Sequence, residues 1–377
     1  MDRRAFYLTI SVVAAAALAG CAETGGSFYR PISRDDYPKP DPALGEKLGK
    51  GEIESTARIA AIIEAHLHNL YPRGTVYRDA HTKANGCVTA RFTVDPGLGA
   101  PLNQGLFKTA RSYDAVIRFS NSNEDRLRPD SEGDGRGMSV KVYGLSDTPL
   151  SQDPKGPPAQ DFIMMTHPTF MVAEPTRYRS LIGYLDSKDN LTKRLKPGLT
   201  ALSLGWTGTK NALAILSLQI DDPLNTRYWS VTPYELGNGP KAVAVKYSAA
   251  PCTPRAVGAS TSTDPDFLRR AMAATLAPGG TGACMRMMVQ PRTSAAMSVE
   301  DPRYEWPEAA APFYQVATIT IPPQTFDTPQ LNRACEELSF SPWHALPDHR
   351  PLGAVNRMRK VIYERISAVR RRSPSLP

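Results

Sequence analysis

The sequence predicts an α+β protein, in which a mostly antiparallel sheet, folded as a barrel or a sandwich, has helices added around it. Short apolar segments with alternating residues recur along the chain, and each is bounded by Gly, Pro, Asp or Asn. The 34 prolines among 377 residues exceed the usual share of about 5% and favour loops and short strands. Hydrophobic residues make up 41% and charged residues 22%, which is typical of an ordered globular protein. We therefore expect few long uninterrupted helices.

The first 20 residues are typical of a secretory signal. A positively charged start precedes an apolar run from Ala5 to Gly20, which is short for a membrane span. The run ends in Leu18-Ala-Gly-Cys21, which resembles the lipobox of bacterial lipoproteins, where the cysteine is lipidated and becomes the first mature residue. An ordinary signal peptide or an uncleaved anchor is the alternative. Because Ala22 and not an aspartate follows Cys21, the resemblance implies a lipid anchor in the cell envelope, at the periplasmic face of the outer membrane.

The charge of the chain limits its partners. The formal net charge is +8, and removal of residues 1–20, with their two arginines and one aspartate, leaves +7. Such a basic chain suits nucleic acid, anionic lipid or the carboxylates of a cofactor. Since the protein is expected to be exported, we expect no nucleic acid.

Four cysteines follow Cys21, at positions 87, 252, 284 and 335. They show neither a CxxC motif nor the spacing of metal ligands. An oxidising compartment permits disulfides, and four cysteines allow three full pairings, but buried free thiols fit a chain of this length equally well. The sequence leaves the pairing open.

The segment after the signal is expected to be a tether, over residues 21–51, because Gly, Pro, Ser and charged residues dominate it. The folded domain is expected over residues 52–372, with a tail at 373–377. Its first helix covers about Glu54–Asn69 and is ended by the Pro and Gly after Tyr71.

Strands and helices follow in turn. Strands are predicted at Cys87–Val94, Tyr113–Asn121, Met138–Gly144, Asp161–Thr166, Lys241–Ser248, Cys284–Val289 and Phe313–Ile321. Further helices are predicted at Thr176–Asp186, Asp264–Leu276 and Gly353–Arg372. His344 and His349, before the last helix, are expected in a solvated loop.

Several motifs bear on chemistry. Arg78-Asp-Ala-His81 precedes the first strand, Arg118-Phe-Ser120 lies in the second, and a Gly-rich turn leads into the third. On the last helix an arginine precedes Tyr363 by four residues, so the two share a face. A phenolate near an arginine is a known ligand for haem iron. Singly, each motif also fits an ordinary packed residue.

Taken in this order, the motifs resemble those of the haem catalase superfamily. Members have an arginine three residues before a distal histidine, an Arg-Phe-Ser strand and a Gly-rich turn into Val-Lys. The blocks Gln160–Phe170 and Glu337–Pro342 also look like family blocks, so the resemblance covers about residues 55–372. It implies a catalase-like antiparallel β-barrel with surrounding helices and a C-terminal haem-ligand helix. Because the chain stops soon after that helix, it looks like a reduced, catalase-related type without the C-terminal helical region.

The resemblance also implies roles for individual residues around a haem, expected to be haem b. Tyr363 corresponds to the iron ligand, with Arg359 as the cation that favours its phenolate form. His81 corresponds to the general base for peroxide. The other implied contacts are Ser120 orienting the imidazole, Arg78, Arg118 and Arg370 binding the propionates, and Phe119 and Phe170 packing by the macrocycle.

One departure affects the distal side. Catalases carry an asparagine near the start of the fourth block, whereas this chain reads Pro157-Pro-Ala-Gln160-Asp161. Gln160 is expected to supply an amide from a similar place, or Asp161 a carboxylate. A changed distal donor shifts the expected balance from disproportionation towards peroxidase work.

The implied function is a haem-dependent catalase or peroxidase that decomposes hydrogen peroxide in the cell envelope through a ferryl intermediate. Its substrate is hydrogen peroxide or an organic hydroperoxide. Two alternatives stay open, which are a haem enzyme that converts lipid hydroperoxides and a haem-binding lipoprotein without significant turnover. The sequence leaves the oligomeric state and the electron donor undetermined.

Overall fold

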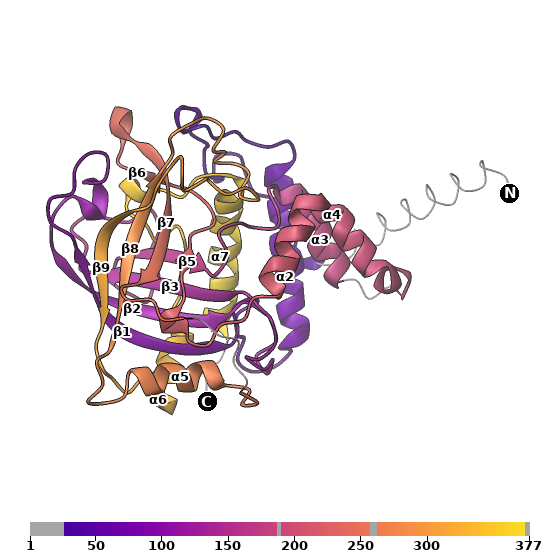
Figure 1. The fold of residues 1–377 in the computed structure, drawn as a ribbon. Coiled ribbons are helices and arrows are strands. Elements are labelled where there is room, and N and C mark those ends of the chain that lie inside the picture. Colours follow the sequence, from indigo (N-terminus) through magenta and orange to yellow (C-terminus); the bar gives the residue numbers. More distant parts are fainter. Residues whose placement is uncertain (1–25, 187–189, 257–261, 374–377) are drawn as a thin grey trace, which may run out of the picture.

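The structure is a computed structural model that describes residues 26–186, 190–256 and 262–373. Within these ranges the strands form one antiparallel sheet in the order β5-β4-β3-β2-β1-β9-β8-β7-β6. β5 pairs with both β4 and β7, so eight strands close into a barrel and β6 is added beside β7 (Figure 1). The strands are β1 (Ala84–Val94), β2 (Ser112–Asn121), β3 (Arg136–Tyr143), β4 (Ala159–Met165), β5 (Tyr228–Trp229), β6 (Tyr234–Leu236), β7 (Val243–Pro251), β8 (Ala283–Pro291) and β9 (Tyr314–Ile321). The predicted antiparallel sheet is thus a barrel rather than a sandwich.

The barrel interior is filled by side chains. Along β1 the alternate residues Val88, Ala90, Phe92 and Val94 are buried, as the period of a strand requires. Aromatic rings from different strands meet at the centre, where the centroids of Phe92 and Phe162 lie 5.8 Å apart. Because this interior is packed, a large ligand has to bind outside the barrel wall.

Helices lie around the barrel. They are α2 (Glu52–Leu70), α3 (Pro175–Asp186), α4 (Asn190–Leu216), α5 (Phe267–Thr275), α6 (Pro329–Glu337) and α7 (Ala354–Arg372). α2 packs against α7 and α3, and α4 packs on α3, so that α3 and α4 project to one side of the barrel (Figure 1). Ile59, Ile63 and Leu67 of α2 share a buried cluster with Val355 and Met358 of α7. This packing fixes α7, which carries Tyr363.

The segment that composition predicts as a tether, residues 21–51, is packed on the domain where the structure describes it. Tyr37 is buried, and its hydroxyl donates to Glu52 Oε1 at 3.0 Å. Arg357 of α7 is fully buried, and its guanidinium donates to Glu46 Oε1 and to Glu52 Oε1, both at 2.7 Å. A buried guanidinium requires carboxylate partners, and Glu46 is one of them. The folded domain therefore begins before the predicted boundary at Glu52.

The seven predicted strands and the four predicted helices are all present, with ends shifted by a few residues. Prediction missed β5 and β6 because they have only two and three residues. It missed α4 because Gly205, with φ of 66°, interrupts the helical pattern. It also missed α6, although Thr328 and Pro329 form a clear start signal, in which Thr328 Oγ1 accepts from the Leu331 N–H.

The prediction of a solvated loop around His344 and His349 is wrong, because both side chains are buried. The Leu106 N–H donates to His349 Nε2 at 2.8 Å, so the ring proton is on Nδ1, which lies 2.8 Å from the Tyr247 hydroxyl. Burial lowers the pKa of His349 to about 3. These contacts anchor the loop before α7 in the core.

The four cysteines after Cys21 are paired in two disulfides, which settles what their spacing left open. Cys87 of β1 is bonded to Cys335 of α6, and Cys252 is bonded to Cys284 of β8. Separately, no helix in the described ranges has both the length and the hydropathy that a membrane crossing requires.

Candidate functional site

A cavity lies between the barrel wall and α7. It holds about 850 Å³ of space, counting the part open to solvent. His81, from the loop before β1, and Tyr363, from α7, both line it. Arg78, Arg118 and Arg370 line it as well, and Ile163 and Met164 of β4 give it an apolar wall. The structure therefore brings together residues that are up to 292 positions apart, from Arg78 to Arg370.

The backbone of His81 adopts an unusual conformation, with φ of 57°. Its N–H donates to the Ser122 carbonyl at 3.2 Å, and its own carbonyl accepts from Arg118 Nη2 at 2.8 Å. A left-handed conformation at a residue other than glycine costs free energy and persists only where its surroundings fix it. These bonds fix the direction in which the imidazole enters the cavity.

The imidazole of His81 is held by a serine and kept neutral. Its Nδ1 lies 3.1 Å from Ser120 Oγ, as the motif order predicts. Burial, and then the charge of Arg118, lower the pKa of His81 to about 4. At neutral pH the ring is therefore uncharged and has a nitrogen free of a proton, so it can act as a base.

Gly137 of β3 makes room for this arrangement. It pairs with Ser120 across the β2–β3 ladder. A Cβ at position 137 would lie 2.6 Å from His81 Nδ1 and 2.8 Å from Ser120 Oγ, closer than side-chain atoms tolerate. In the sequence Gly137 is only the end of a Gly-rich turn, and its contact with His81 becomes visible only in the fold.

Tyr363 and Arg359 lie one helical turn apart on α7. The guanidinium of Arg359 donates to Thr232 Oγ1 at 3.3 Å and to Asn356 Oδ1 at 3.4 Å. It also lies 5.7 Å above the ring of Phe170. Arg359 thus lies one turn before Tyr363 on α7 and packs against Phe170, but neither Arg359 nor Phe170 is among the described residues that line the cavity.

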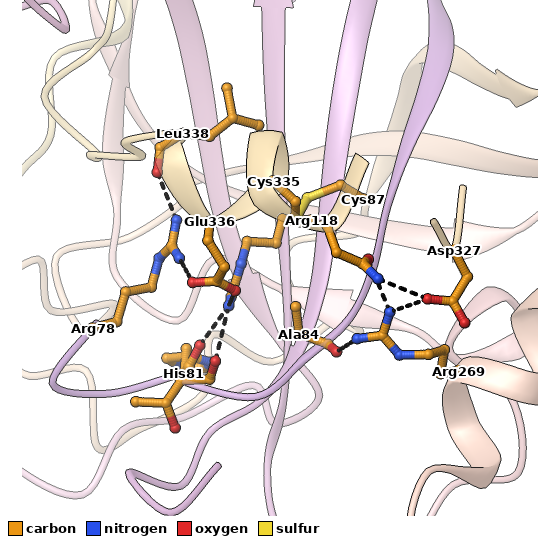
Figure 2. The surroundings of a disulfide bond; sticks show 12 residues. Arg78, His81, Ala84, Cys87, Arg118, Arg269, Asp327, Cys335, Glu336 and Leu338 are labelled. Carbon is orange, nitrogen blue, oxygen red and sulfur yellow. Dashed lines mark hydrogen bonds and ion pairs between the residues drawn. A yellow bond between two sulfur atoms is a disulfide. The ribbon is translucent and has the colours of Figure 1, made fainter. Parts of the chain in front are cut away.

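Three arginines that line the cavity contact Glu336, and Figure 2 shows two of them, Arg78 and Arg118, at its carboxylate. Arg78 Nη1 donates to Glu336 Oε2 at 2.5 Å, and Arg118 Nη2 donates to Glu336 Oε1 at 3.4 Å. Arg370 donates to the Glu336 carbonyl. Burial opposes ionisation of Glu336, but the charges of the three arginines outweigh it and hold the pKa of that carboxyl below its usual value.

The arginine cluster keeps open hydrogen-bond donors. Burial, followed by the charge of Arg370, lowers the pKa of Arg78 to about 10, and burial, followed by the charge of Arg78, lowers that of Arg118 to about 9. The Nε atoms of Arg118 and Arg370 are buried and have no hydrogen-bond partner within the described part of the chain. Two of the three guanidinium groups share the Glu336 carboxylate, and Asp79, which also lines the cavity, carries a second carboxylate. Carboxylates of a ligand would satisfy these open donors.

Glu336, which sequence reasoning did not single out, is fixed by its neighbours in the chain. The residue before it, Cys335, is bonded to Cys87 of β1, with Cα atoms 5.7 Å apart (Figure 2). The residue two positions after it, Leu338, accepts from Arg78 Nη2 at 2.6 Å. The disulfide therefore attaches the end of α6 to the barrel directly beside the arginine cluster.

The structure corrects the distal donors suggested by the sequence. The Oε1 of Gln160 accepts from the Leu346 N–H at 2.9 Å, and its Nε2 donates to the Asp161 carbonyl at 3.2 Å. Asp161 is buried in an ion pair with Lys141 at 2.6 Å. Both side chains therefore connect β4 to its neighbours in the core. Neither is among the described residues that line the cavity.

Phe119 also differs from its expected place. Its side chain is fully buried in the barrel core, with its ring centroid 6.0 Å from that of Tyr228. The physical reason is the alternation of β2, because Arg118 and Ser120 point to the His81 side and Phe119 must point inward. Phe119 therefore supports the barrel and does not line the cavity.

No protein-family model and no curated protein matches the chain. Solved structures do match it. A fungal catalase has a TM-score of 0.61 and 14% identity, over 92% of this chain and 71% of the catalase. Catalase A from Saccharomyces cerevisiae has a TM-score of 0.59 and 15% identity, over 90% of this chain and 71% of that protein.

A bacterial catalase has a TM-score of 0.60 and 14% identity, over 81% of this chain and 59% of the catalase. At such low identity the match concerns the fold alone. It agrees with the antiparallel barrel and the surrounding helices described above. The chain therefore has the catalase-like fold that the order of its motifs predicts.

Proposed function

We propose that this chain binds haem through Tyr363 and decomposes hydrogen peroxide. The observation that carries the proposal is that His81 and Tyr363 line one cavity together with Arg118 and Arg370, whose buried Nε donors have no hydrogen-bond partner within the described part of the chain. Haem needs an iron ligand, an apolar slot and partners for two propionates. Tyr363, the apolar wall of Ile163 and Met164, and the arginines of the cavity offer these three features.

The residues that would hold haem follow from their contacts. Tyr363 offers its phenolic oxygen as the iron ligand, and Arg359 lies one turn earlier on α7. The open Nε donors of Arg118 and Arg370 suit the propionates, together with Arg78. When bound, haem supplies a metal centre that takes up peroxide and exchanges electrons with it.

The protein's own contribution is proton transfer. The neutral His81 takes the proton of an incoming peroxide on the nitrogen that does not face Ser120, and returns it to the oxygen that leaves as water. Ser120 and the space at Gly137 hold the ring in position for both transfers. Ile163 and Met164 keep the adjacent wall apolar and limit access of water.

Reconstitution with haem tests this function. The full chain loaded with haem is expected to show a tyrosinate-type Soret and charge-transfer spectrum and to evolve oxygen from hydrogen peroxide. Tyr363→Phe should lose that spectrum, and His81→Ala should keep it while losing turnover. Bound haem with neither oxygen evolution nor donor oxidation would refute the enzymatic proposal, and an unchanged spectrum in Tyr363→Phe would refute the ligand assignment.

A second candidate, peroxidase work or haem binding with little turnover, is favoured by the distal wall. The described residues that line the cavity include no carboxamide, because Gln160 is bonded to Leu346 and Asp161. Oxidation of an aromatic donor by peroxide without oxygen evolution would identify the peroxidase. Conversion of a fatty-acid hydroperoxide in the absence of a donor would instead identify the lipid-hydroperoxide enzyme, for which the apolar wall is suited.

We propose further that the protein is exported and carries a lipid on Cys21. This rests on the charged start, the apolar run and the lipobox-like Leu18-Ala-Gly-Cys21. Cells fed with labelled palmitate should label the wild-type protein and not Cys21→Ser. Equal labelling of both would contradict lipidation at this residue.

A further inference from the structure

α4 carries the largest group of exposed apolar side chains in the described part of the molecule. Of the eleven large hydrophobic side chains with substantial exposure, five belong to this helix. They are Leu195, Leu202, Trp206, Leu213 and Leu216. Leu202 is 75% exposed and Trp206 is 88% exposed. Large apolar residues gathered in this way mark a surface that contacts a partner.

The opposite side of α4 is the one that holds it to the molecule. Leu204, Asn211 and Ile215 are buried. Asn211 Nδ2 donates to the Phe170 carbonyl at 2.8 Å and to the Arg303 carbonyl at 2.9 Å. A Cβ at Gly208 would lie 2.3 Å from the Met171 carbonyl oxygen, so the helix approaches that backbone as closely as a glycine allows.

Both before and after Gly205, the exposed residues lie on a different side of α4 from the buried ones. Trp206 and Leu213 are seven residues apart within the second part of α4, and Leu195 and Leu202 are seven apart within the first, so each pair lies on one side of its helix. Because the buried face already packs on α3 and its surroundings, core packing does not account for the exposed one. We call these five residues the α4 apolar face.

We propose that the α4 apolar face lies on the surface of a lipid membrane. Tryptophan and leucine beside basic residues are the composition of helices that lie in a membrane interface. Here the basic neighbours are the exposed Lys210 of α4 and Arg177 of α3. A net charge of +7 after residue 20 attracts anionic headgroups, and it makes two copies repel each other, which favours lipid over a second copy as occupant.

The start of the described chain supports this occupant. The ring of Phe28 stacks on that of His68 of α2 with centroids 4.9 Å apart, and Arg365 of α7 donates to the Phe28 carbonyl. α2 packs on α3, which carries α4, so this start and the α4 apolar face belong to one group of helices. From Cys21 to Gly26 the chain spans at most about 17 Å. A lipid on Cys21 therefore keeps this helical group close to the bilayer.

This inference rests on the lipid anchor proposed above and is independent of haem chemistry. The full lipidated protein is reconstituted into vesicles of phosphatidylethanolamine and phosphatidylglycerol that contain lipid with brominated acyl chains. Bromine quenches tryptophan emission only on close approach. Of the chain's four tryptophans, Trp306 and Trp343 are buried and Trp206 is the strongly exposed one. The expected result is quenching in the wild type that is absent from Trp206→Phe.

Leu202→Asp should also reduce the quenching, because it places a charge in the α4 apolar face. Leu127→Asp is the matched control, since Leu127 is 86% exposed but lies in the loop between β2 and β3, and it should behave as the wild type. Flotation with the vesicles is measured on the same samples. It separates failure of the anchor from failure of the α4 contact.

Three outcomes overturn the inference. Equal quenching in the wild type and Trp206→Phe, with flotation intact, refutes the contact of α4 alone. A wild type that does not float refutes both the anchor and the contact. The third outcome is a wild type that is a dimer in detergent and a Leu202→Asp variant that is a monomer. It would show that the α4 apolar face joins two copies of the chain.

Discussion

Gly137 lies against the imidazole of His81, so closely that an added Cβ would come within 2.6 Å of Nδ1. The contact joins the β2–β3 ladder to the loop before β1. Gly137 is therefore part of the machinery that positions the proposed base, although it carries no functional group of its own.

Gly137→Ala should lower peroxide turnover on the order of 100-fold while haem still binds, because displacement of a proton-transfer group by about 1 Å has effects of that size. Turnover and the Soret spectrum are measured together. Gly99→Ala is the control, since nothing lies within 4 Å of its Cβ position. Undiminished turnover in Gly137→Ala would show that the imidazole does not need its observed position.

Glu336→Gln should destabilise the protein without haem by about 3 kcal/mol, because the variant leaves the buried arginines without their carboxylate. Haem should then raise the melting temperature of the variant more than that of the wild type, since propionates would partly replace the lost charge. Thermal unfolding with and without haem measures both effects. Glu337→Gln, on the exposed side of α6, is the matched control. Equal haem-induced shifts in Glu336→Gln and the wild type would argue against propionates at these arginines.

Removal of the Cys87–Cys335 disulfide by a double serine substitution should weaken haem binding as well as stability. A disulfide contributes roughly 2–4 kcal/mol, and this one also fixes the residue before Glu336. Removal of Cys252–Cys284, which joins the end of β7 to β8, should cost stability alone. Haem titrations of the two double variants make the comparison. Similar haem affinities in both would show that the first disulfide has no special role at the site.

The rate of reaction with peroxide should stay constant from pH 8 down to about pH 5 and fall with a midpoint near pH 4. The reason is that the pKa of His81 is about 4, so the imidazole stays neutral over that range. Stopped-flow measurement of the second-order rate constant against pH checks this. A midpoint near 6.5, the pKa of an ordinary histidine, would contradict the position of His81 in a buried, positively charged surrounding.

The same shift affects stability. In the folded state the pKa of His81 and that of His349 lie near 4 and 3, whereas in the unfolded chain both are about 6.5. Between these values the unfolded state binds more protons, so stability is full above pH 6.5 and is lost progressively as the pH falls towards 3. His349→Gln should flatten this part of the profile in urea unfolding measured from pH 7 to pH 4. A profile as steep as that of the wild type would assign the acid sensitivity to other groups.

The sequence by itself determined the elements and much of the site. Alternation along β2 and β7 and the apolar spacing of α2 predicted their types, because strand and helix periods are local properties of the chain. The motif order singled out Arg78, His81 and Tyr363, and these three line one cavity in the structure. The short β5 and the interrupted α4 were not predicted, since neither has a sustained local pattern.

Only the tertiary structure decided which of these groups meet. It closed the barrel through β5, brought His81 and Tyr363 into one cavity, and turned Gln160 and Phe119 away from it. It also supplied Glu336 and Gly137, whose roles depend on neighbours far away in the sequence. The physical reason is that charge balance and close packing are properties of groups in space, whereas spacing along a chain specifies only the side of a single helix or strand.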